Sequence, residues 1–311
     1  MTARGMPSPT PSRTPGARAP APPLVLGVLG GSGLYALEEL EGARWEKVES
    51  PFGAPSDALL RGRLGGVPLV FLPRHGRGHR IPPSEINYRA NIDALKRAGV
   101  TDLIALGACG SLREELAPGA FVLVDQFVDR TTSRARSFFG SGLVAHVSMA
   151  SPVCARLGDA LEAAARELAI PLVRGGVYLA MEGPQFSSRA ESELYRSWGC
   201  DVIGMTNMPE ARLAREAELC YASVSMVTDY DCWHPEHGHV EVADIVQVLA
   251  SNALRGRELL ARAAGRLVGR AVPCPQGCDR ALESAFITAP EARDPELVRR
   301  LDAVAGRVLA G

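Results

Sequence analysis

Lysine is nearly absent from this sequence, although arginine is abundant. Of the 34 basic residues, only Lys47 and Lys96 are lysines. A Walker-type phosphate loop ends in Gly-Lys-Ser/Thr and Schiff-base catalysis needs a lysine amine, so both are disfavoured here. If this chain binds a phosphate group, arginine side chains and backbone N–H groups have to hold it.

The chain also lacks a large net charge and a long apolar run. Its formal net charge is −1, so no overall field would attract nucleic acid or an anionic membrane. No apolar run reaches the roughly 18 residues that a membrane-spanning helix needs. We therefore expect a cytoplasmic protein without nucleic-acid or membrane partners. Because 46% of its 311 residues are hydrophobic, the chain can bury a sizeable core.

The seven cysteines are an odd number, and most of them stand apart from one another. Five lie dispersed among apolar segments: Cys109, Cys154, Cys200, Cys220 and Cys232. This pattern predicts reduced thiols in a cytoplasmic protein. Cys274 and Cys278 flank a short turn-rich segment and could form a redox pair or half of a metal site. No histidine or further cysteine stands near them in the sequence, so we expect no metal.

Buried strands alternate with helices along most of the chain. Strands are predicted at 24–29, 103–106, 121–127, 176–180, 202–205 and 221–227, with a hairpin of 58–64 and 67–72. Helices are predicted at 87–98, 157–168, 189–198 (capped by Ser188), after Asn207, at 242–267 and from Pro295. This alternation indicates an α/β fold with a central mixed sheet flanked by helices.

Three regions follow from composition. Residues 1–23 are rich in proline and arginine and contain no acid, so we expect a disordered tail. Residues 24–267 form a single predicted domain. Residues 268–311 form a C-terminal extension whose last helix is expected to pack on that domain.

Polar and glycine-rich segments follow several predicted strands. Gly30–Gly33 and Gly107–Ser111 are predicted glycine turns, and Pro73–Arg80 is the densest cationic segment of the chain. Each could be an ordinary turn or a solvated basic loop. Because ligands of open α/β sheets bind where strands end, we instead predict that the three converge on one anion.

Residues 201–231 contain two further clusters at predicted strand ends. Met205, Thr206 and Asn207 follow one strand, and Asp229 and Asp231 follow the next. Upstream, residues 181–188 place an acid, an aromatic ring and a serine together, which suits a flat heterocycle or, alternatively, a capped turn. We expect the chemistry of the protein at these strand ends.

Eight motifs in order carry a resemblance to a known family. They are GGSGL, RHGRGH, NYRAN, ACGSLREE, DQFVDRTT, MEGPQFSSRAES, GMTNMPEA and TDYDCW, and they cover about residues 25–267. The chain resembles the purine nucleoside phosphorylase/methylthioadenosine phosphorylase family, on its methylthioadenosine side. The resemblance implies a nucleoside phosphorylase-like fold, a pentosyltransferase and a homotrimer or a dimer of trimers. It also implies no cofactor, because inorganic phosphate is a co-substrate.

The implied reaction is phosphorolysis of 5′-methylthioadenosine to adenine and 5-methylthioribose 1-phosphate. By matching position, the residues that would hold phosphate are Ser32, Arg74, His75, Gly107, Ala108 and Thr206. Those that would surround the nucleoside are Phe186 and Ser187 at the base, Met205 at the ribose, and His146 (from a neighbouring subunit), Val242, Ile245 and Val246 at the 5′ group. Two positions depart from the family pattern: Gly107 replaces a frequent threonine, and Gln185 replaces an arginine.

Asp229 and Asp231 are the implied catalytic residues. Cleavage of the N-glycosidic bond puts negative charge on the purine, so a group must deliver a proton to N7. An aspartate can do so if its surroundings raise its pKa. A carboxylate also accepts from a 6-amino group, whereas an asparagine would donate to a 6-oxo group. Asp229 therefore favours adenine, and a phosphorylase for 6-oxopurine nucleosides such as inosine, guanosine or methylthioinosine is the alternative.

Two readings from other functional classes also fit part of the sequence. His234, His237 and His239, together with Asp229 and Asp231, could converge on a zinc ion, but no second ligand set supports a metal enzyme. A non-catalytic nucleoside-binding protein would need a broken phosphate site, and only the one hydroxyl contact at Gly107 is missing. A phosphorylase therefore fits the motifs best.

Overall fold

The computed structural model describes residues 22–31, 40–235 and 242–310 of the chain, and for 242–245 it describes only the backbone. The predicted tail at 1–23 lies almost wholly outside this range, as do Ser32, His237 and His239. No described helix combines the length and the apolar content that crossing a membrane requires.

The described strands form one mixed sheet with the order β2-β3-β4-β1-β5-β10-β9-β7, and β11, β6 and β8 branch from β5. The strands are β1 Leu26–Gly30, β2 Glu41–Glu46, β3 Leu59–Leu64, β4 Val67–Pro73, β5 Asp102–Ser111, β6 Phe121–Val124, β7 Gln126–Asp129, β8 Leu172–Arg174, β9 Val177–Ala180, β10 Val202–Gly204 and β11 Cys220–Asp229. The long strand β5 organises the sheet, because it pairs in parallel with β1 and β11 and antiparallel with β10.

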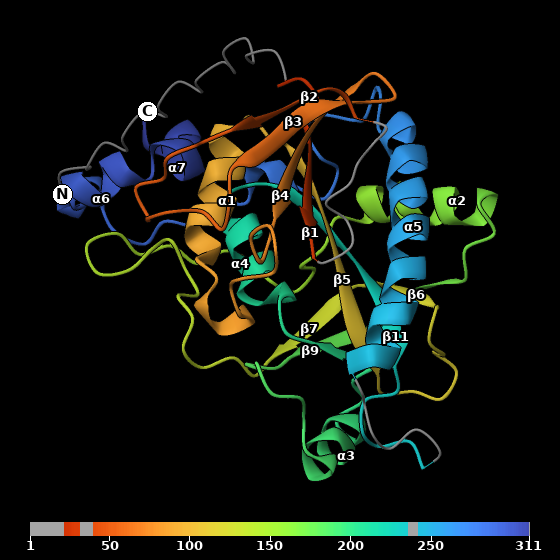
Figure 1. The fold of residues 1–311 in the computed structure, drawn as a ribbon. Helices are drawn as coiled ribbons and strands as arrows, with labels where there is room; N and C mark the ends of the chain where they lie inside the picture. Colours follow the sequence, from red (N-terminus) through yellow and green to blue (C-terminus); the bar gives the residue numbers. More distant parts are fainter. Residues whose placement is uncertain (1–21, 32–39, 236–241, 311) are drawn as a thin grey trace, which may run out of the picture.

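Helices cover both faces of the sheet. They are α1 Tyr88–Arg97, α2 Ala155–Glu167, α3 Arg189–Ser197, α4 Asn207–Glu216, α5 Val242–Arg266, α6 Pro295–Arg300 and α7 Asp302–Leu309. Figure 1 shows α1, α4 and α7 on one side of the central strands and α2 and α5 on the other. Alternate residues of β5 reach the two cores, because Leu103 and Ala105 pack on the first side and Ile104 and Leu106 on the second. The predicted α/β fold with helices flanking a mixed sheet is confirmed.

Local sequence signals account for the helix ends near the site. The Asn87 side chain accepts the backbone N–H of Ala90 and starts α1. Ser188 and Glu191 form a capping box that starts α3. Both starts were predicted within one residue, and the 59–73 hairpin is also confirmed, since β3 and β4 pair antiparallel through Gly65 and Gly66.

Two predicted elements are wrong in their local structure. Residues 107–111 are not a glycine turn, because β5 continues through them and pairs with β11 and β10. A side chain at Gly110 would stand 3.0 Å from Asp229 Oδ1, so this glycine allows two strands to approach closely rather than reversing the chain. The predicted strand 121–127 is two strands, β6 and β7, which pair with β11 and β9 respectively.

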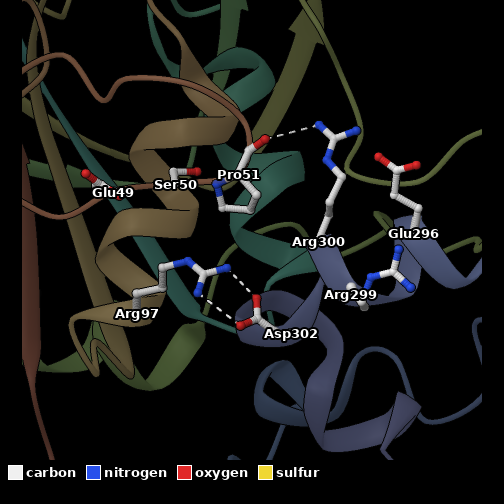
Figure 2. Close-up of a pocket in the computed structure, with 8 residues that line it drawn as sticks. All are labelled: Glu49, Ser50, Pro51, Arg97, Glu296, Arg299, Arg300 and Asp302. Carbon is white, nitrogen blue, oxygen red and sulfur yellow. Dashed lines mark hydrogen bonds and ion pairs between the residues drawn. The ribbon is translucent and has the colours of Figure 1, made fainter.

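The C-terminal helices pack against α1. Leu301 and Val304 are buried in the core beside that helix. Figure 2 shows Arg97 of α1 in contact with Asp302 of α7, and both line a surface depression of about 550 Å³. Arg300 Nη2 donates to the Pro51 carbonyl at 3.3 Å. These contacts attach the end of the chain to the face of the sheet that α1 covers.

Candidate active site

A cavity of about 720 Å³ opens at the carboxyl ends of the central strands. Its lining comes from the segments after β4 and β10, from the second half of β5, from the end of β11 and from α5. The predicted site residues on this lining are Arg74, His75, Gly107, Ala108, Phe186, Met205, Thr206, Asp229, Asp231 and Val246. The structure therefore brings the basic segment, the β5 glycines and the two acids around one space.

Arg74 is buried at the base of this cavity and is held by a carboxylate that sequence reasoning did not identify. Its Nε lies 2.7 Å from Glu210 Oε2, and its Nη2 lies 3.1 Å from Glu210 Oε1. Tyr221 donates to the same carboxylate at 2.9 Å, and Arg74 Nη1 donates to the Leu106 carbonyl at 3.2 Å. Because both partners are only 1% exposed, the guanidinium is fixed in one orientation before any ligand binds.

Gly107 faces the same space as Arg74 and Thr206. A Cβ added at Gly107 would lie 3.8 Å from Arg74 Nη1 and 3.8 Å from Thr206 Oγ1. The guanidinium and the hydroxyl group thus converge over a backbone position that carries no side chain. A tetrahedral oxyanion placed there would meet donors from the segments that follow β4 and β10.

His75 is neutral in this setting. Burial lowers the pKa of its imidazole to about 4, outweighing the bond to the Ile81 carbonyl, and the neighbouring Arg74 charge lowers it further. His75 Nδ1 lies 2.9 Å from that carbonyl, which places the ring proton on Nδ1. The His79 ring stacks on it at 4.2 Å. The Nε2 lone pair of a neutral His75 can therefore accept a hydrogen bond from the O–H group of a hydrogen phosphate.

Asp229 and Asp231 have different environments at the end of β11. Burial raises the pKa of the Asp229 carboxyl, although the Thr228 hydroxyl donates to Oδ2 at 2.7 Å and lowers it in part. Asp231 accepts the Ser187 hydroxyl at 2.8 and 2.7 Å, and its backbone N–H donates to Asp229 Oδ1 at 2.8 Å. Ser187 is therefore held by Asp231 and is absent from the cavity lining. Asp229 lines the cavity and has a pKa raised by burial, so it is suited to carry a proton.

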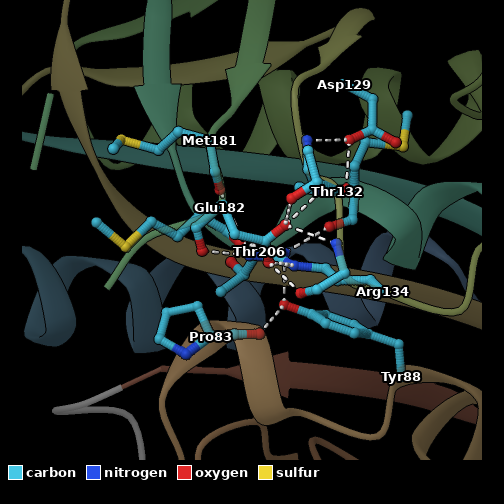
Figure 3. A network of polar contacts seen from close by, with 12 residues as sticks. Pro83, Tyr88, Asp129, Thr132, Arg134, Met181, Glu182 and Thr206 are labelled. Carbon is cyan, nitrogen blue, oxygen red and sulfur yellow. Dashed lines mark hydrogen bonds and ion pairs between the residues drawn. The ribbon is translucent and has the colours of Figure 1, made fainter. Parts of the chain in front are cut away.

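Arg134 connects the loops that surround the cavity, and no sequence motif identified it individually. Its Nη1 donates to the carbonyls of Met205 and Met208 at 2.6 and 2.7 Å and to the Tyr88 hydroxyl at 2.9 Å. Its Nη2 donates to the Glu182 carbonyl at 2.7 Å. Figure 3 shows this side chain between the Glu182 and Thr206 segments. One buried guanidinium thus sets the position of the backbone that carries Met205 and Thr206.

The apolar end of the cavity is formed by α5. Val246 and Leu249, three residues apart on that helix, both line it, and Leu249 was not predicted. The side chains of Val242 and Ile245 lie outside the described residues. His146 is exposed and lines a different surface depression, beside Arg136 and Glu216. Within one chain, therefore, His146 does not reach the cavity.

The alternative histidine–aspartate metal site receives no support from the residues that the structure describes. The ring of His234 stacks on Tyr230 with 4.7 Å between centroids. Together with Asp229 and Asp231, it does not form a described group whose ligand atoms could share one ion. His237 and His239 lie outside the described range.

Comparison with known proteins agrees with this geometry. Residues 25–264 match the Phosphorylase superfamily. The chain is 62% identical over 287 residues to S-methyl-5′-thioadenosine phosphorylase of Cereibacter sphaeroides, covering 92% of this chain and 99% of that protein. It is 64% identical over 287 residues to the Bradyrhizobium diazoefficiens protein of the same name, with the same two coverages.

Solved structures show the same relationship. A methylthioadenosine phosphorylase from an Antarctic soil metagenomic library is 43% identical with a TM-score of 0.85, over 91% of this chain and 99% of that one. The Schistosoma mansoni methylthioadenosine phosphorylase in complex with adenine is 39% identical with a TM-score of 0.80, over 84% and 98%. This chain belongs to the phosphorylase superfamily and, within it, to the family of S-methyl-5′-thioadenosine phosphorylases.

Proposed function

We propose that this chain catalyses the phosphorolysis of 5′-methylthioadenosine to adenine and 5-methylthioribose 1-phosphate, without a cofactor. The observation that carries the proposal is the arrangement of one cavity. A guanidinium fixed by Glu210 and the Thr206 hydroxyl converge at one side, and a carboxyl group with a raised pKa, Asp229, lines the other. These are an anion site and a proton donor in the same enclosed space.

Phosphate would bind over Gly107, between Arg74 Nη1 and Thr206 Oγ1, with neutral His75 accepting a hydrogen bond from its O–H group. One phosphate oxygen then forms a bond to C1′ of the sugar as the bond between C1′ and N9 breaks. Holding the anion beneath the sugar removes most of the entropic cost of bringing the reactants together. Met205, fixed by Arg134 through its carbonyl, would contact the ribose.

The electron pair of the broken bond goes to the purine. Asp229 would donate its proton to N7, so that adenine leaves as a neutral molecule. Phe186, which is half exposed and lines the cavity, would lie against the base. Ser187 would act through Asp231, whose carboxylate it holds, rather than by direct contact with the base.

The decisive experiment measures release of the free base with and without phosphate. Methylthioadenosine, adenosine and inosine are compared side by side at equal concentration. We expect phosphate-dependent release from methylthioadenosine, weaker release from adenosine and little from inosine. Stronger release from inosine would favour the 6-oxopurine alternative, and release that is independent of phosphate would refute phosphorolysis.

The preference for the methylthio group would come from the apolar wall of α5. Val246 and Leu249 can surround a methylthio group, whereas a 5′-hydroxyl group placed there would lose a hydrogen bond, at a cost of about 1–3 kcal/mol. We therefore expect a kcat/KM for methylthioadenosine roughly 10- to several-hundredfold above that for adenosine. His146 is exposed in its own chain, so its contribution to this pocket requires a neighbouring subunit, which we propose belongs to a homotrimer.

That assembly has its own test. Light scattering coupled to gel filtration gives the mass in solution, and His146→Ala is assayed with both nucleosides. We expect a trimer, or a multiple of it, and a loss of selectivity between the two nucleosides in the variant. A monomer that retains full selectivity would contradict the shared pocket and leave the phosphorolysis itself untouched.

A further inference from the structure

Four buried cysteines from three separate segments meet at the edge of the sheet opposite the cavity. Cys154 immediately precedes α2, Cys220 begins β11, and Cys274 and Cys278 follow α5. Each is at most 3% exposed. Their Sγ atoms all lie within 4.8 Å of one another, and no other such group of potential metal ligands occurs among the residues described.

This juxtaposition could not be seen in the sequence. Cys274 and Cys278 have no histidine or cysteine close to them along the chain, which argued against a metal site. The fold supplies the two missing thiols from positions more than fifty residues upstream. The pair that was considered as half of a metal site therefore has two further thiols beside it.

The segment that contains Cys274 and Cys278 is folded tightly around its two sulfur atoms. The N–H of Gly277 donates to the Cys274 carbonyl at 2.8 Å, and Gly277 has a φ of 68°, which glycine adopts readily. Asp279 accepts the N–H of Cys274 at 2.8 Å. Gln276 accepts the N–H of Ala155, so the turn is bound to the start of α2, beside Cys154.

The spacing of the sulfur atoms matches a tetrahedral metal site. Cys154 Sγ and Cys274 Sγ are 3.7 Å apart. A zinc–sulfur bond of about 2.3 Å gives a tetrahedral sulfur–sulfur edge of about 3.8 Å. All four cysteines are free thiols in this arrangement. Cysteines packed only as small apolar residues would have no reason to turn their four sulfur atoms toward one point.

The surroundings contain charged groups of both signs, among them the buried Asp102, which is ion-paired with Arg156 and Arg270 and lies opposite Cys220 in the sheet. A zinc ion with four thiolates carries a net charge of −2. Arg156 interacts electrostatically with Cys154 and Cys220, Lys96 with Cys220, and Arg215 with Cys278. Lys96 is one of only two lysines in the chain. More cations than this one buried carboxylate therefore lie near the cluster, which also packs against apolar side chains of α2 and α5.

We propose that Cys154, Cys220, Cys274 and Cys278 bind one zinc ion in a closed tetrathiolate site. Four protein ligands leave no position for water or substrate, so the site is structural. It joins the segment after α5 to the start of α2 and to β11, on the side of the sheet shown with α2 and α5 in Figure 1. Cys220 and Asp229 are the first and last residues of the ten-residue strand β11, which puts them about 30 Å apart, so the ion takes no part in catalysis.

The test begins with the metal content of the full-length protein, expressed with zinc in the medium and purified without chelators. Elemental analysis is expected to find about one zinc per chain in the wild type and in the control Cys200→Ser, a buried cysteine outside the cluster. Cys274→Ser is expected to lose the metal. Zinc in substoichiometric traces, iron in its place, or equal zinc in Cys274→Ser would overturn the proposal.

Two further measurements use the wild-type chain, so they do not depend on whether a variant folds. Replacing the ion with Co²⁺ is expected to give the intense visible bands and the thiolate-to-metal charge transfer of a tetrahedral sulfur site. Thiol titration without reductant is expected to find all seven cysteines only after denaturant and chelator are added. Seven thiols that react in denaturant without release of metal would show a reduced cluster, and a deficit reversed by reductant would show disulfides; either result refutes the zinc site.

Discussion

Strand β11 begins at a group of four buried thiols and ends at a pair of largely buried carboxyl groups, and its two ends are built in opposite ways. At the carboxyl end, Asp229 and Asp231 face a cavity of about 720 Å³. At the amino end, the sulfur of Cys220 points into a cluster whose members are at most 3% exposed. The same strand therefore has one end open to a ligand and one end closed.

The two ends of β11 differ in their effect on the stability of the fold. Burial raises the pKa of Asp229, so its charged form is destabilised relative to water. At the thiol end, four ligands and nearby cations would satisfy one ion completely. A catalytic site needs polar groups that are free to contact a ligand, whereas a structural metal site is most stable when every ligand atom is bound.

The largest effect is expected when the proton donor at the cavity end of β11 is removed. Asp229→Asn should lower kcat/KM for methylthioadenosine by about 10²–10⁴-fold, because a general acid is lost, and should raise cleavage of inosine. Steady-state assays with both nucleosides measure this. The exposed substitution Asp159→Asn is the control. Unchanged turnover of methylthioadenosine would remove Asp229 from the reaction.

The second prediction separates the two ligands of the open end. Arg74→Ala should raise the KM for phosphate by about 10²-fold, the loss of a charge-assisted contact of 1.5–3 kcal/mol or slightly more. The KM for the nucleoside should change little. Glu210→Gln keeps the guanidinium but weakens its fixation, so it should have a smaller effect of the same kind. Equal changes in both KM values would place Arg74 outside the phosphate site.

At the thiol end of β11, we expect a substitution to lower stability and to leave activity nearly unchanged. Cys274→Ser should leave kcat/KM within about twofold of the wild type. Its melting temperature should fall by roughly 5–10 °C, because a cross-link of about 3 kcal/mol is lost. Differential scanning calorimetry and the nucleoside assay measure the two quantities on one preparation, with Cys200→Ser as the matched control. A large loss of activity at unchanged melting temperature would mean that the two ends of β11 are not independent.

Acid should lower the free energy of unfolding through the protonation of His75. The folded state holds this pKa at about 4, whereas the unfolded chain takes up the proton near 6.5. The unfolded state therefore binds more protons between these values, and stability falls as pH decreases from about 6.5 to 4. The contribution is roughly 3 kcal/mol. Urea unfolding across this range should show a shallower pH dependence for His75→Gln, and an identical slope would contradict a neutral buried imidazole.

The smallest effect is expected at Gly107 of β5, which has no side chain to contact phosphate. Gly107→Thr should lower the KM for phosphate by about 2- to 10-fold, since one added hydrogen bond contributes about 0.5–1.5 kcal/mol. A Cβ there meets no atom closer than 3.8 Å, so the side chain can be accommodated. Gly107→Val has the same shape without the hydroxyl group and should not improve phosphate binding. Equal behaviour of the two variants would exclude a missing hydroxyl contact.

Periodicity predicted the elements well where one rule governed a segment. The apolar pattern and the asparagine cap identify α1, and the Ser188/Glu191 pair identifies the start of α3. Prediction failed at 107–111, where glycine usually marks a turn. There β5 continues because β11 and β10 offer hydrogen-bond partners, and Gly110 makes room for Asp229. Long-range pairing overrode the local signal.

The sequence by itself determined the fold class, the family and most of the residues around the cavity, because those depend on local periodicity and on motifs that keep their order. Only the tertiary structure decided which distant groups meet. Glu210 comes to Arg74 from 136 residues away, and Cys154 comes to Cys274 from 120 residues away. Such contacts depend on strand order and on helix packing across the sheet. The residue pattern of one segment does not determine its distance from another segment or their relative orientation.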